Sequence, residues 1–335
     1  MKRRTFIYVA GSVLLVVGAV LPAAAQAPAT TVRRIGFLSN TSPPTKTSPL
    51  EIYAPSLIDP PLRELGWIEG QNLIIERRYA DGKYELLRHF AEELVRLNVE
   101  IIVTNGTDAA IAGKKATTNI PIVLLAVGDP VRTGLVQSLA RPGGNITGFS
   151  ILSAELEAKQ LQILHELLPA AHRVGVLVDP TSPINTFVRD EREQTFRSLG
   201  IQPIFVEVSI PSKVEDAVET VARQRGQAIL VANDGLFLST RIALMRAALK
   251  YGLPAAVSHK LLLEAGGLLS YTISRAESYR RNAAFVDKIL HGAKPADLPI
   301  EQPTIFELGI NLKTAKALGV TVPQALLLRA QEVIR

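Results

Sequence analysis

The 335-residue chain contains no cysteine. Without thiols the protein has no disulfide scaffold, no cysteine-ligated zinc or iron–sulfur cluster and no thiol nucleophile. The charge excess is also small, because 37 lysines and arginines against 31 aspartates and glutamates give a net charge of +6. Lys2, Arg3 and Arg4 supply half of it, and the remainder is too weakly basic for a typical nucleic-acid-binding protein.

Several catalytic motifs are missing as well. No glycine-rich dinucleotide or phosphate loop follows the first buried run, and neither His-Glu-x-x-His nor Gly-x-Ser-x-Gly occurs. The sequence therefore predicts no catalytic residue, no metal site and no cofactor. A carboxylate pair of the glycosidase type stays open, although no acidic pair is placed to suggest one.

Only the N-terminus carries a long hydrophobic run. The three basic residues precede the mostly apolar segment 6–21, and small residues follow at 23–27. This order is typical of a secretory signal peptide. A helix of this length reaches about 24 Å, short of a hydrocarbon core of about 30 Å, which favours a cleaved signal over a permanent anchor.

We therefore expect a signal peptide at residues 1–25, cleaved after Ala25, with Ala27 as the alternative site. The mature chain is expected in the periplasm. The pair Arg3-Arg4 has the appearance of a twin-arginine signal, but such pairs are common, so both export routes stay open.

The mature chain alternates apolar runs with amphipathic stretches. Residues 34–39, 99–103 and 120–127 predict strands, whereas the apolar spacing at 84–97 and the segment 108–116 predict helices. Strands that alternate with helices predict an α/β fold, with parallel sheets covered by helices on both faces.

The pattern occurs twice. The segment 34–38 is echoed by 173–177, and Ile101-Ile102-Val103-Thr104-Asn105 is echoed by Ile229-Leu230-Val231-Ala232-Asn233. We infer two doubly wound lobes of the same topology. The helix expected at 277–290 follows the second copy, which predicts that the chain crosses back to the first lobe through a hinge.

Ligands of open α/β sheets bind beyond the carboxyl ends of the strands. Five loops occupy such places, at 39–47, 105–108, 128–130, 179–182 and 233–235. Their backbone N–H groups suit an anion, and Asp129 or Asp234 suits an ammonium group, so a zwitterion such as an amino acid is expected. The same residue types are common helix caps and turn formers, and that alternative stays open.

The candidate ligand-binding residues come from these loops and from nearby strand ends. Tyr79 and Tyr271 offer an aromatic wall, and His259 is the histidine placed to face the cleft. The candidates are Ser39, Asn40, Tyr79, Asn105, Gly106, Thr107, Gly128, Asp129, Asp179, Thr181, Asn233, Asp234, His259 and Tyr271.

Longer motifs at 62–70, 139–148, 264–271, 287–299 and 311–319 carry a family resemblance. With them, the sequence resembles the ABC-transporter substrate-binding family that includes the tryptophan/tyrosine-type binding proteins. The resemblance implies a type I periplasmic binding fold with three hinge crossings. It also implies capture of a small solute and its delivery to an inner-membrane permease with a cytoplasmic ATPase, without ATP binding by this chain.

On this basis we expect one lobe from 26–148 with 273–300, and another from 149–272 with 301–335. The leading hypothesis is a monomeric, non-enzymatic receptor that closes around an amino acid or another aromatic or zwitterionic solute, with no nucleic-acid partner. The alternatives are a periplasmic sensor for a membrane signalling protein and, less favoured, a secreted enzyme.

The sequence departs from the family pattern near the expected cleft. Pro60-Pro61 interrupts the first family helix, so we expect a shorter helix capped by Asp59 after an irregular loop at 39–58. Gly106-Thr107-Asp108 stands where the family has Gly-Thr-Pro, and Ser270-Tyr271-Thr272 stands where it has Ser-Tyr-Gly. The family's ligand therefore does not transfer directly.

Overall fold

The computed structural model describes residues 32–43, 58–151, 153–182, 185 and 187–335. The expected signal peptide at 1–25 lies outside the described residues, as does most of the expected irregular loop.

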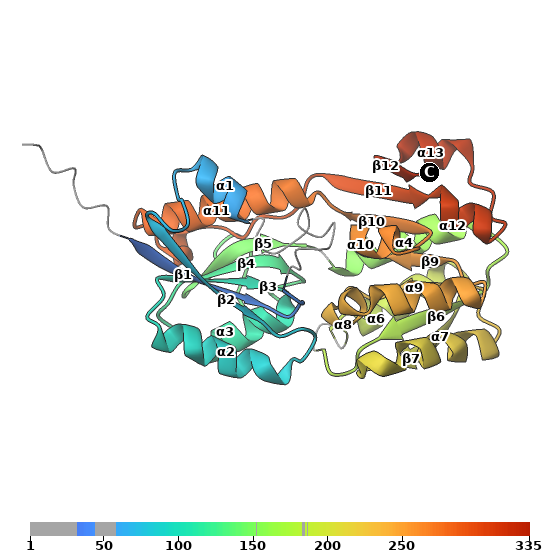
Figure 1. Ribbon diagram of the computed structural model, residues 1–335, viewed down its shortest axis with the longest axis horizontal. Coiled ribbons are helices and arrows are strands. Elements are labelled where there is room, and N and C mark those ends of the chain that lie inside the picture. The colour runs from blue at the N-terminus through green and yellow to red at the C-terminus, as the bar shows by residue number, and fades with distance from the viewer. Residues whose placement is uncertain (1–31, 44–57, 152, 183–184, 186) are drawn as a thin grey trace, which may run out of the picture. The chain divides into compact units, whose positions relative to one another are not determined.

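Five parallel strands form one sheet, which we call the N-terminal sheet, in the order β2-β1-β3-β4-β5 (Figure 1). Four of its strands are mostly buried apolar runs, as expected for a parallel sheet covered on both faces, whereas the edge strand β2 is partly buried and carries three charged residues. They are β1 Arg33–Ser39, β2 Leu73–Tyr79, β3 Ile101–Asn105, β4 Ile122–Val127 and β5 Ile146–Ser150.

Seven strands form the C-terminal sheet, in the order β12-β11-β10-β9-β8-β6-β7. The order β7-β6-β8-β9-β10 matches that of the N-terminal sheet, so the predicted repeat is confirmed. Its strands are β6 Arg173–Val178, β7 Gln202–Glu207, β8 Ala228–Val231, β9 Ala255–Val257, β10 Leu269–Ile273, β11 Phe306–Asn311 and β12 Glu332–Ile334.

One strand differs from the parallel sheets that were expected. β11 pairs antiparallel with β10, whereas the other neighbours in the C-terminal sheet are parallel. The reason is topological, because the chain reaches β11 from the end of the sheet at which β10 leaves it.

Helices cover both faces of the N-terminal sheet. One core cluster joins it to α2 (Glu85–Arg96) and α3 (Thr107–Ala116), and another joins it to α1 (Asp59–Glu64) and α11 (Arg275–Leu290). α11 packs against β4 and β5, so the chain returns to the N-terminal sheet after the second repeat.

Helix α1 begins close to the position that its prolines predict. Pro60 and Pro61 occupy its first turn, where their missing N–H groups cost nothing. The cap position is Ile58 and not Asp59 as expected. Asp59 is the first helical residue instead, and its carboxylate accepts a hydrogen bond from Arg77 at 2.7 Å.

The remaining helices surround or extend the C-terminal sheet. They are α4 Ser153–Leu167, α6 Arg189–Ser198, α7 Val214–Arg223, α8 Gly235–Ser239, α9 Arg241–Lys250, α10 Lys260–Glu264, α12 Leu312–Ala317 and α13 Gln324–Arg329, with short 3-10 turns at Pro211–Lys213 and Pro295–Asp297. Among the helices of the described residues, none is long and apolar enough to cross a membrane.

Three chain segments run between the two sheets and lie beside one another. Ser150 donates a backbone hydrogen bond to Glu301 at 2.9 Å, and Ser274 donates one to Ile305 at 3.0 Å. The segments that leave β5, leave β10 and enter β11 are therefore hydrogen-bonded neighbours, next to the strand ends that carry the candidate site.

Candidate functional site

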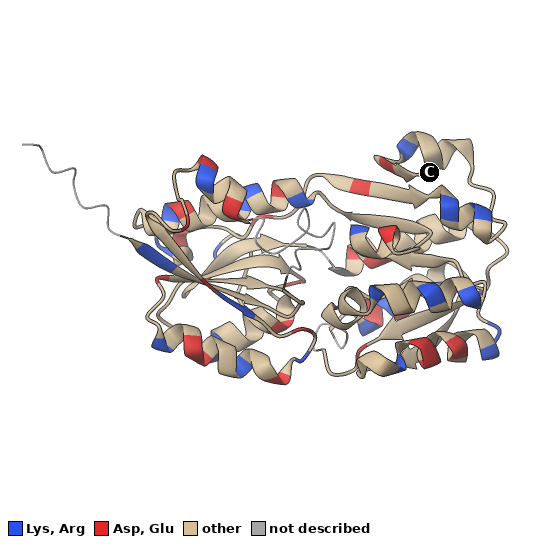
Figure 2. Ribbon diagram, viewed as in Figure 1, with Lys and Arg blue, Asp and Glu red and all other residues tan. Residues whose placement is uncertain are grey.

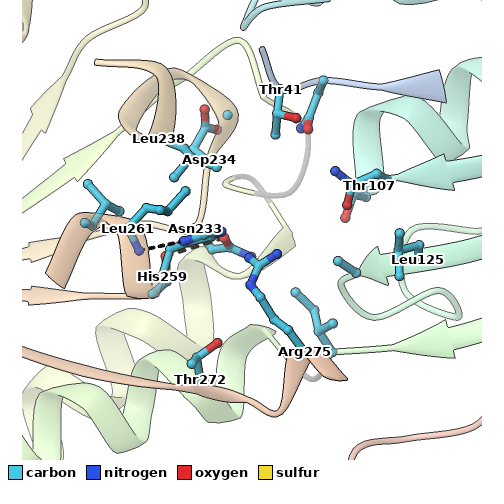
Figure 3. A pocket seen from close by; sticks show the side chains of 18 of the residues that line it. Thr41, Thr107, Leu125, Asn233, Asp234, Leu238, His259, Leu261, Thr272 and Arg275 are labelled. Carbon is cyan, nitrogen blue, oxygen red and sulfur yellow. Dashed lines mark hydrogen bonds between the residues drawn. The ribbon is translucent and has the colours of Figure 1, made fainter. Parts of the chain in front are cut away.

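A cavity of about 140 Å³ lies where the strand ends of the two sheets meet (Figure 3). The N-terminal sheet contributes the end of β4 and residues after β1, β3 and β5, and the C-terminal sheet contributes the end of β10 and residues after β8, β9 and β10. This is the place at which open α/β sheets bind ligands.

Seven of the fourteen predicted residues line this cavity. Asn40 packs over Gly106, whose φ of +96° suits glycine and whose missing side chain makes room for the Asn40 amide. The seven are Asn40, Asn105, Gly106, Thr107, Asn233, Asp234 and His259.

Three more of the fourteen, Asp129, Asp179 and Thr181, lie in the predicted loops 128–130 and 179–182, but their polar groups bond within their own loop. The Asp129 carboxylate accepts from the backbone N–H groups of Val131 and Arg132, at 3.0 and 3.1 Å. The Asp179 carboxylate likewise accepts from the backbone and the hydroxyl of Thr181, at 2.8 and 2.6 Å. These side chains serve as turn caps and do not line the cavity.

The last four also lie outside the cavity lining. Tyr79 packs on Phe37, and Tyr271 stacks on Phe306 with ring centroids 5.8 Å apart. The Ser39 hydroxyl accepts a hydrogen bond from the Asn105 amide at 3.1 Å, and the backbone N–H of Gly128 donates to the Thr107 hydroxyl. The expected aromatic wall is therefore not formed by these two tyrosines.

Asp234 is a buried carboxylate with its acceptor positions in use. One oxygen caps α8 through the Leu236 N–H at 2.9 Å and accepts a hydrogen bond from the Tyr84 hydroxyl. The other accepts from the Asn185 amide at 3.4 Å. Burial raises the pKa of Asp234 to about 7, and the nearby negative charges of Asp108 and Asp179 add to the rise.

Asp108 closes the predicted loop 105–108 and lines the cavity, although it was not among the fourteen candidates. Its Oδ2 accepts from the Ser182 hydroxyl at 3.1 Å and from the Asn40 amide at 3.5 Å. Its Oδ1 is buried and has no hydrogen-bond partner within the described part of the chain. Burial raises the pKa of Asp108 to about 6.

Two arginines line the same cavity, Arg241 at the start of α9 and Arg275 at the start of α11. In the described ranges, neither lies within 4 Å of a carboxylate oxygen as an ion pair. Arg241 donates to the backbone oxygen of Leu238 at 3.1 Å, and Arg275 donates to the Tyr279 hydroxyl at 3.3 Å. The Arg275 Nε is buried and has no hydrogen-bond partner among the residues described.

His259 lies next to both arginines. Its Nδ1 accepts from the Leu261 N–H at 3.0 Å, so the proton of the neutral ring is on Nε2. Burial, and then the positive charges of Arg275 and Arg241, hold the pKa of His259 well below its usual value. The ring is therefore neutral, and the positive charge in this part of the cavity comes from the two guanidinium groups.

Sequence reasoning missed both arginines, because Arg241 begins a helix that follows another helix, and Arg275 follows β10 at a place that was assigned to a hinge crossing. Their only sequence signal is that they begin helices entered from the neighbourhood of β8 and β10. The cavity thus combines buried carboxylates with arginines, which suits a small molecule carrying both charges. Among the described residues, no group of three or more histidines, aspartates or glutamates is placed to hold a metal ion.

The comparisons with known proteins agree with this geometry. The model of the family described as ABC transporter substrate binding protein matches residues 56–334. A tyrosine-binding protein of Clostridioides difficile is 27% identical over 261 residues, covering 77% of this chain and 74% of that protein.

Two solved structures are similar over nearly the whole chain. An ABC domain from Streptococcus pneumoniae in complex with L-Trp has a TM-score of 0.82 at 25% identity, covering 91% of this chain and all of that one. A conserved domain protein from Vibrio cholerae has a TM-score of 0.84 at 25% identity, covering 90% of this chain and all of that one.

Proposed function

Since the chain belongs to the ABC transporter substrate-binding protein family, we propose that it is the extracytoplasmic receptor of an importer that captures an amino acid. The observation that carries the proposal is the cavity lined from the strand ends of both sheets, with groups of both charges in it. As a member of this family, the chain is a binding protein and not an enzyme.

The proposed mechanism is closure of two lobes. One lobe comprises 26–148 with 273–300 and contains the N-terminal sheet except the end of β5; the other comprises 149–272 with 301–335. The three adjacent segments between the sheets suit a hinge, because changes in only a few of their backbone torsions would be enough to bring the strand ends of the two sheets closer together. A ligand that contacts both lobes would hold them together.

The relatives support an amino acid as ligand, because one is a tyrosine-binding protein and another was solved with L-Trp. The cavity lining here includes apolar side chains on opposite sides, among them Leu125 and Leu261, together with Ile151 and Leu156, and Tyr279 adds an aromatic ring. Micromolar binding requires only about 8 kcal/mol, which a few charged hydrogen bonds and one buried side chain supply.

The proposed partners follow from the transport role. After export and cleavage near Ala25, the mature monomer would deliver its ligand to an inner-membrane permease with a cytoplasmic ATPase. A nucleic-acid partner is not part of the proposal. In its support, Figure 2 shows basic and acidic residues interspersed along helices beside both sheets.

The proposal is tested with the mature protein purified from its native export compartment. Mass spectrometry identifies any small molecule that co-purifies, and a thermal-shift screen with the twenty L-amino acids follows on ligand-stripped protein. We expect at least one amino acid to raise the melting temperature, since a ligand at 100 times its Kd stabilises by about 2.7 kcal/mol. Absence of both a bound small molecule and any shift would refute the proposal.

A further inference from the structure

We propose that the cavity holds a free amino acid by both of its backbone charges, with Arg241 and Arg275 receiving the carboxylate and Asp108 receiving the ammonium group. This inference rests on the proposed function and deepens it, because it assigns the two charged subsites and requires both ligand charges. It moves the ammonium site from Asp234, the sequence candidate, to Asp108.

The carboxylate subsite is argued from the two arginines. Both line the cavity, Arg241 at the start of α9 and Arg275 at the start of α11, and the positive charges of both act on His259. Figure 3 shows the Arg275 side chain extending from the start of α11 toward Asn233 and His259. Two such groups without a carboxylate partner in the described chain call for an anion, and a carboxylate matches guanidinium geometry.

The ammonium subsite is argued from the difference between two aspartates. Both carboxylate oxygens of Asp234 already accept hydrogen bonds, from the Leu236 N–H, the Tyr84 hydroxyl and the Asn185 amide. Asp108 instead keeps Oδ1 buried without a partner among the described residues, while its residue is only 7% exposed. A buried carboxylate oxygen without a donor is costly, and an ammonium N–H would satisfy it.

Each proposed subsite contains groups from both sides of the cavity. Arg275 begins α11, which packs on the N-terminal sheet, whereas Arg241 begins α9 in the C-terminal half. Asp108 belongs to α3 and accepts a hydrogen bond from Ser182, which follows β6. A ligand carboxylate that both arginines bind would therefore connect the two halves of the protein.

The apolar side chains of the lining favour some amino acids over others. Leu125, Ile151, Leu156 and Leu261 present aliphatic surface, and Tyr279 is the tyrosine of the described lining. An amino acid with an aliphatic or aromatic side chain would bury it there. A second negative group would lie among these apolar side chains without a partner, so acidic amino acids are expected to bind less tightly.

Arg275 also lines a second cavity, of about 380 Å³, outside the start of α11. Arg280, on the same helix, lines only this outer cavity and is exposed. Arg280→Gln is therefore a matched control for Arg275→Gln. Asp297→Asn, at an exposed 3-10 turn, is the control for Asp108→Asn.

The test measures calorimetric Kd values for L-tryptophan, L-tyrosine, L-phenylalanine and L-leucine with the mature protein. Each that binds is compared with its amide, which lacks the carboxylate charge, and with its N-acetyl derivative, which lacks the ammonium charge. We expect both derivatives to bind about 30-fold or more weakly than the free amino acid.

The variants locate the two subsites. In Arg275→Gln, we expect the Kd of the free amino acid to rise by about 30-fold or more, so that the amino acid and its amide bind about equally. In Asp108→Asn, we expect the free amino acid and its N-acetyl derivative to bind about equally. The control variants Arg280→Gln and Asp297→Asn should keep the wild-type Kd values for all three compounds. Circular dichroism and the unliganded melt show whether each variant is folded.

Several outcomes overturn the inference. Equal binding of acid and amide refutes the carboxylate subsite, and an Asp108→Asn variant with unchanged selectivity refutes the ammonium subsite. If Asp234→Asn alone abolishes amine selectivity, the ammonium belongs to Asp234. If none of the four amino acids binds but mass spectrometry finds another solute in the cavity, this inference fails while the proposed receptor function stands.

Discussion

The Tyr84 hydroxyl, at the start of α2 beside the N-terminal sheet, donates a hydrogen bond to the Asp234 carboxylate, at the end of β8 in the C-terminal sheet. Burial and the adjacent charge of Asp234 raise the pKa of Tyr84, so the hydroxyl keeps its proton and remains a donor. This contact joins the two halves of the protein next to the cavity.

Tyr84→Phe is expected to lower the free energy of unfolding at pH 8, where Asp234 is mostly ionised, by about 1.5–3 kcal/mol, because a hydrogen bond to a charged group is lost. Urea denaturation followed by circular dichroism measures the change. Tyr251→Phe is the control, since the Tyr251 hydroxyl accepts a hydrogen bond from the exposed Lys250 at 3.2 Å. An equal loss in both variants would contradict a bridging role for Tyr84.

The two buried aspartates predict that the unliganded protein is stabilised by mild acid. Their folded pKa values, about 7 for Asp234 and about 6 for Asp108, lie above the unfolded value of 3.8. Between these values the folded state binds more protons than the unfolded state, so stability is lost as pH rises from about 4 to about 7. Each group contributes a slope of up to about 1.4 kcal/mol per pH unit.

Denaturation series at several pH values test this for the wild type and for Asp108→Asn. The difference between the two should change most from pH 4 to pH 6 and then level off. The groups that face these carboxylates are the uncharged side chains of Tyr84, Ser182, Asn40 and Asn185, and the carboxylate of Asp179. A difference that is constant with pH would show that Asp108 is not perturbed.

A buried ion pair forms part of the cavity wall. Glu157, which lines the cavity, accepts two hydrogen bonds from Arg192, at 2.8 and 3.0 Å, and thereby joins α4 to α6. Glu157→Gln leaves the Arg192 charge buried without its partner, so we expect a loss of about 3–5 kcal/mol in the free energy of unfolding.

The matched control is the exposed pair of Arg88 and Glu92, whose side chains are 84% and 43% exposed. Glu92→Gln should cost less than about 0.5 kcal/mol. Urea denaturation of the two glutamine variants under the same conditions gives the comparison. Similar costs for both would mean that water reaches the buried pair.

Much of the fold could be predicted because its strands are short, apolar and repeated. Buried runs such as Val174 to Val178 have few alternatives in an α/β pattern, and the helical stripe of Leu87 and Leu94 gave α2 nearly to the residue. The antiparallel β11 could not be predicted in this way, since its direction depends on where the chain re-enters the sheet.

The position of the cavity could be predicted, but only half of the candidate residues line it. Strand-end reasoning selected Asn105 and Asn233, because carboxyl ends of parallel strands share an edge. It does not determine whether a side chain turns toward the cavity or caps its own loop, as Asp129 does. Arg275 was missed because its position depends on how α11 packs, which no local pattern encodes.

Gly148 gives a prediction about the strand that leads out of the N-terminal sheet. Its φ is +130°, and a Cβ there would lie 2.4 Å from the backbone nitrogen of Leu124 in β4. Because backbone atoms cannot move aside as a side chain can, Gly148→Ala must separate β5 from β4. The loss in the free energy of unfolding should exceed the roughly 1–2 kcal/mol that a left-handed backbone alone costs an alanine.

Gly200→Ala measures that smaller cost by itself, since Gly200 has a φ of +65° with open space around it. In urea denaturation, Gly148→Ala should therefore be the less stable variant by a clear margin, and equal stability would mean that β5 shifts to accommodate the methyl group without losing its pairing.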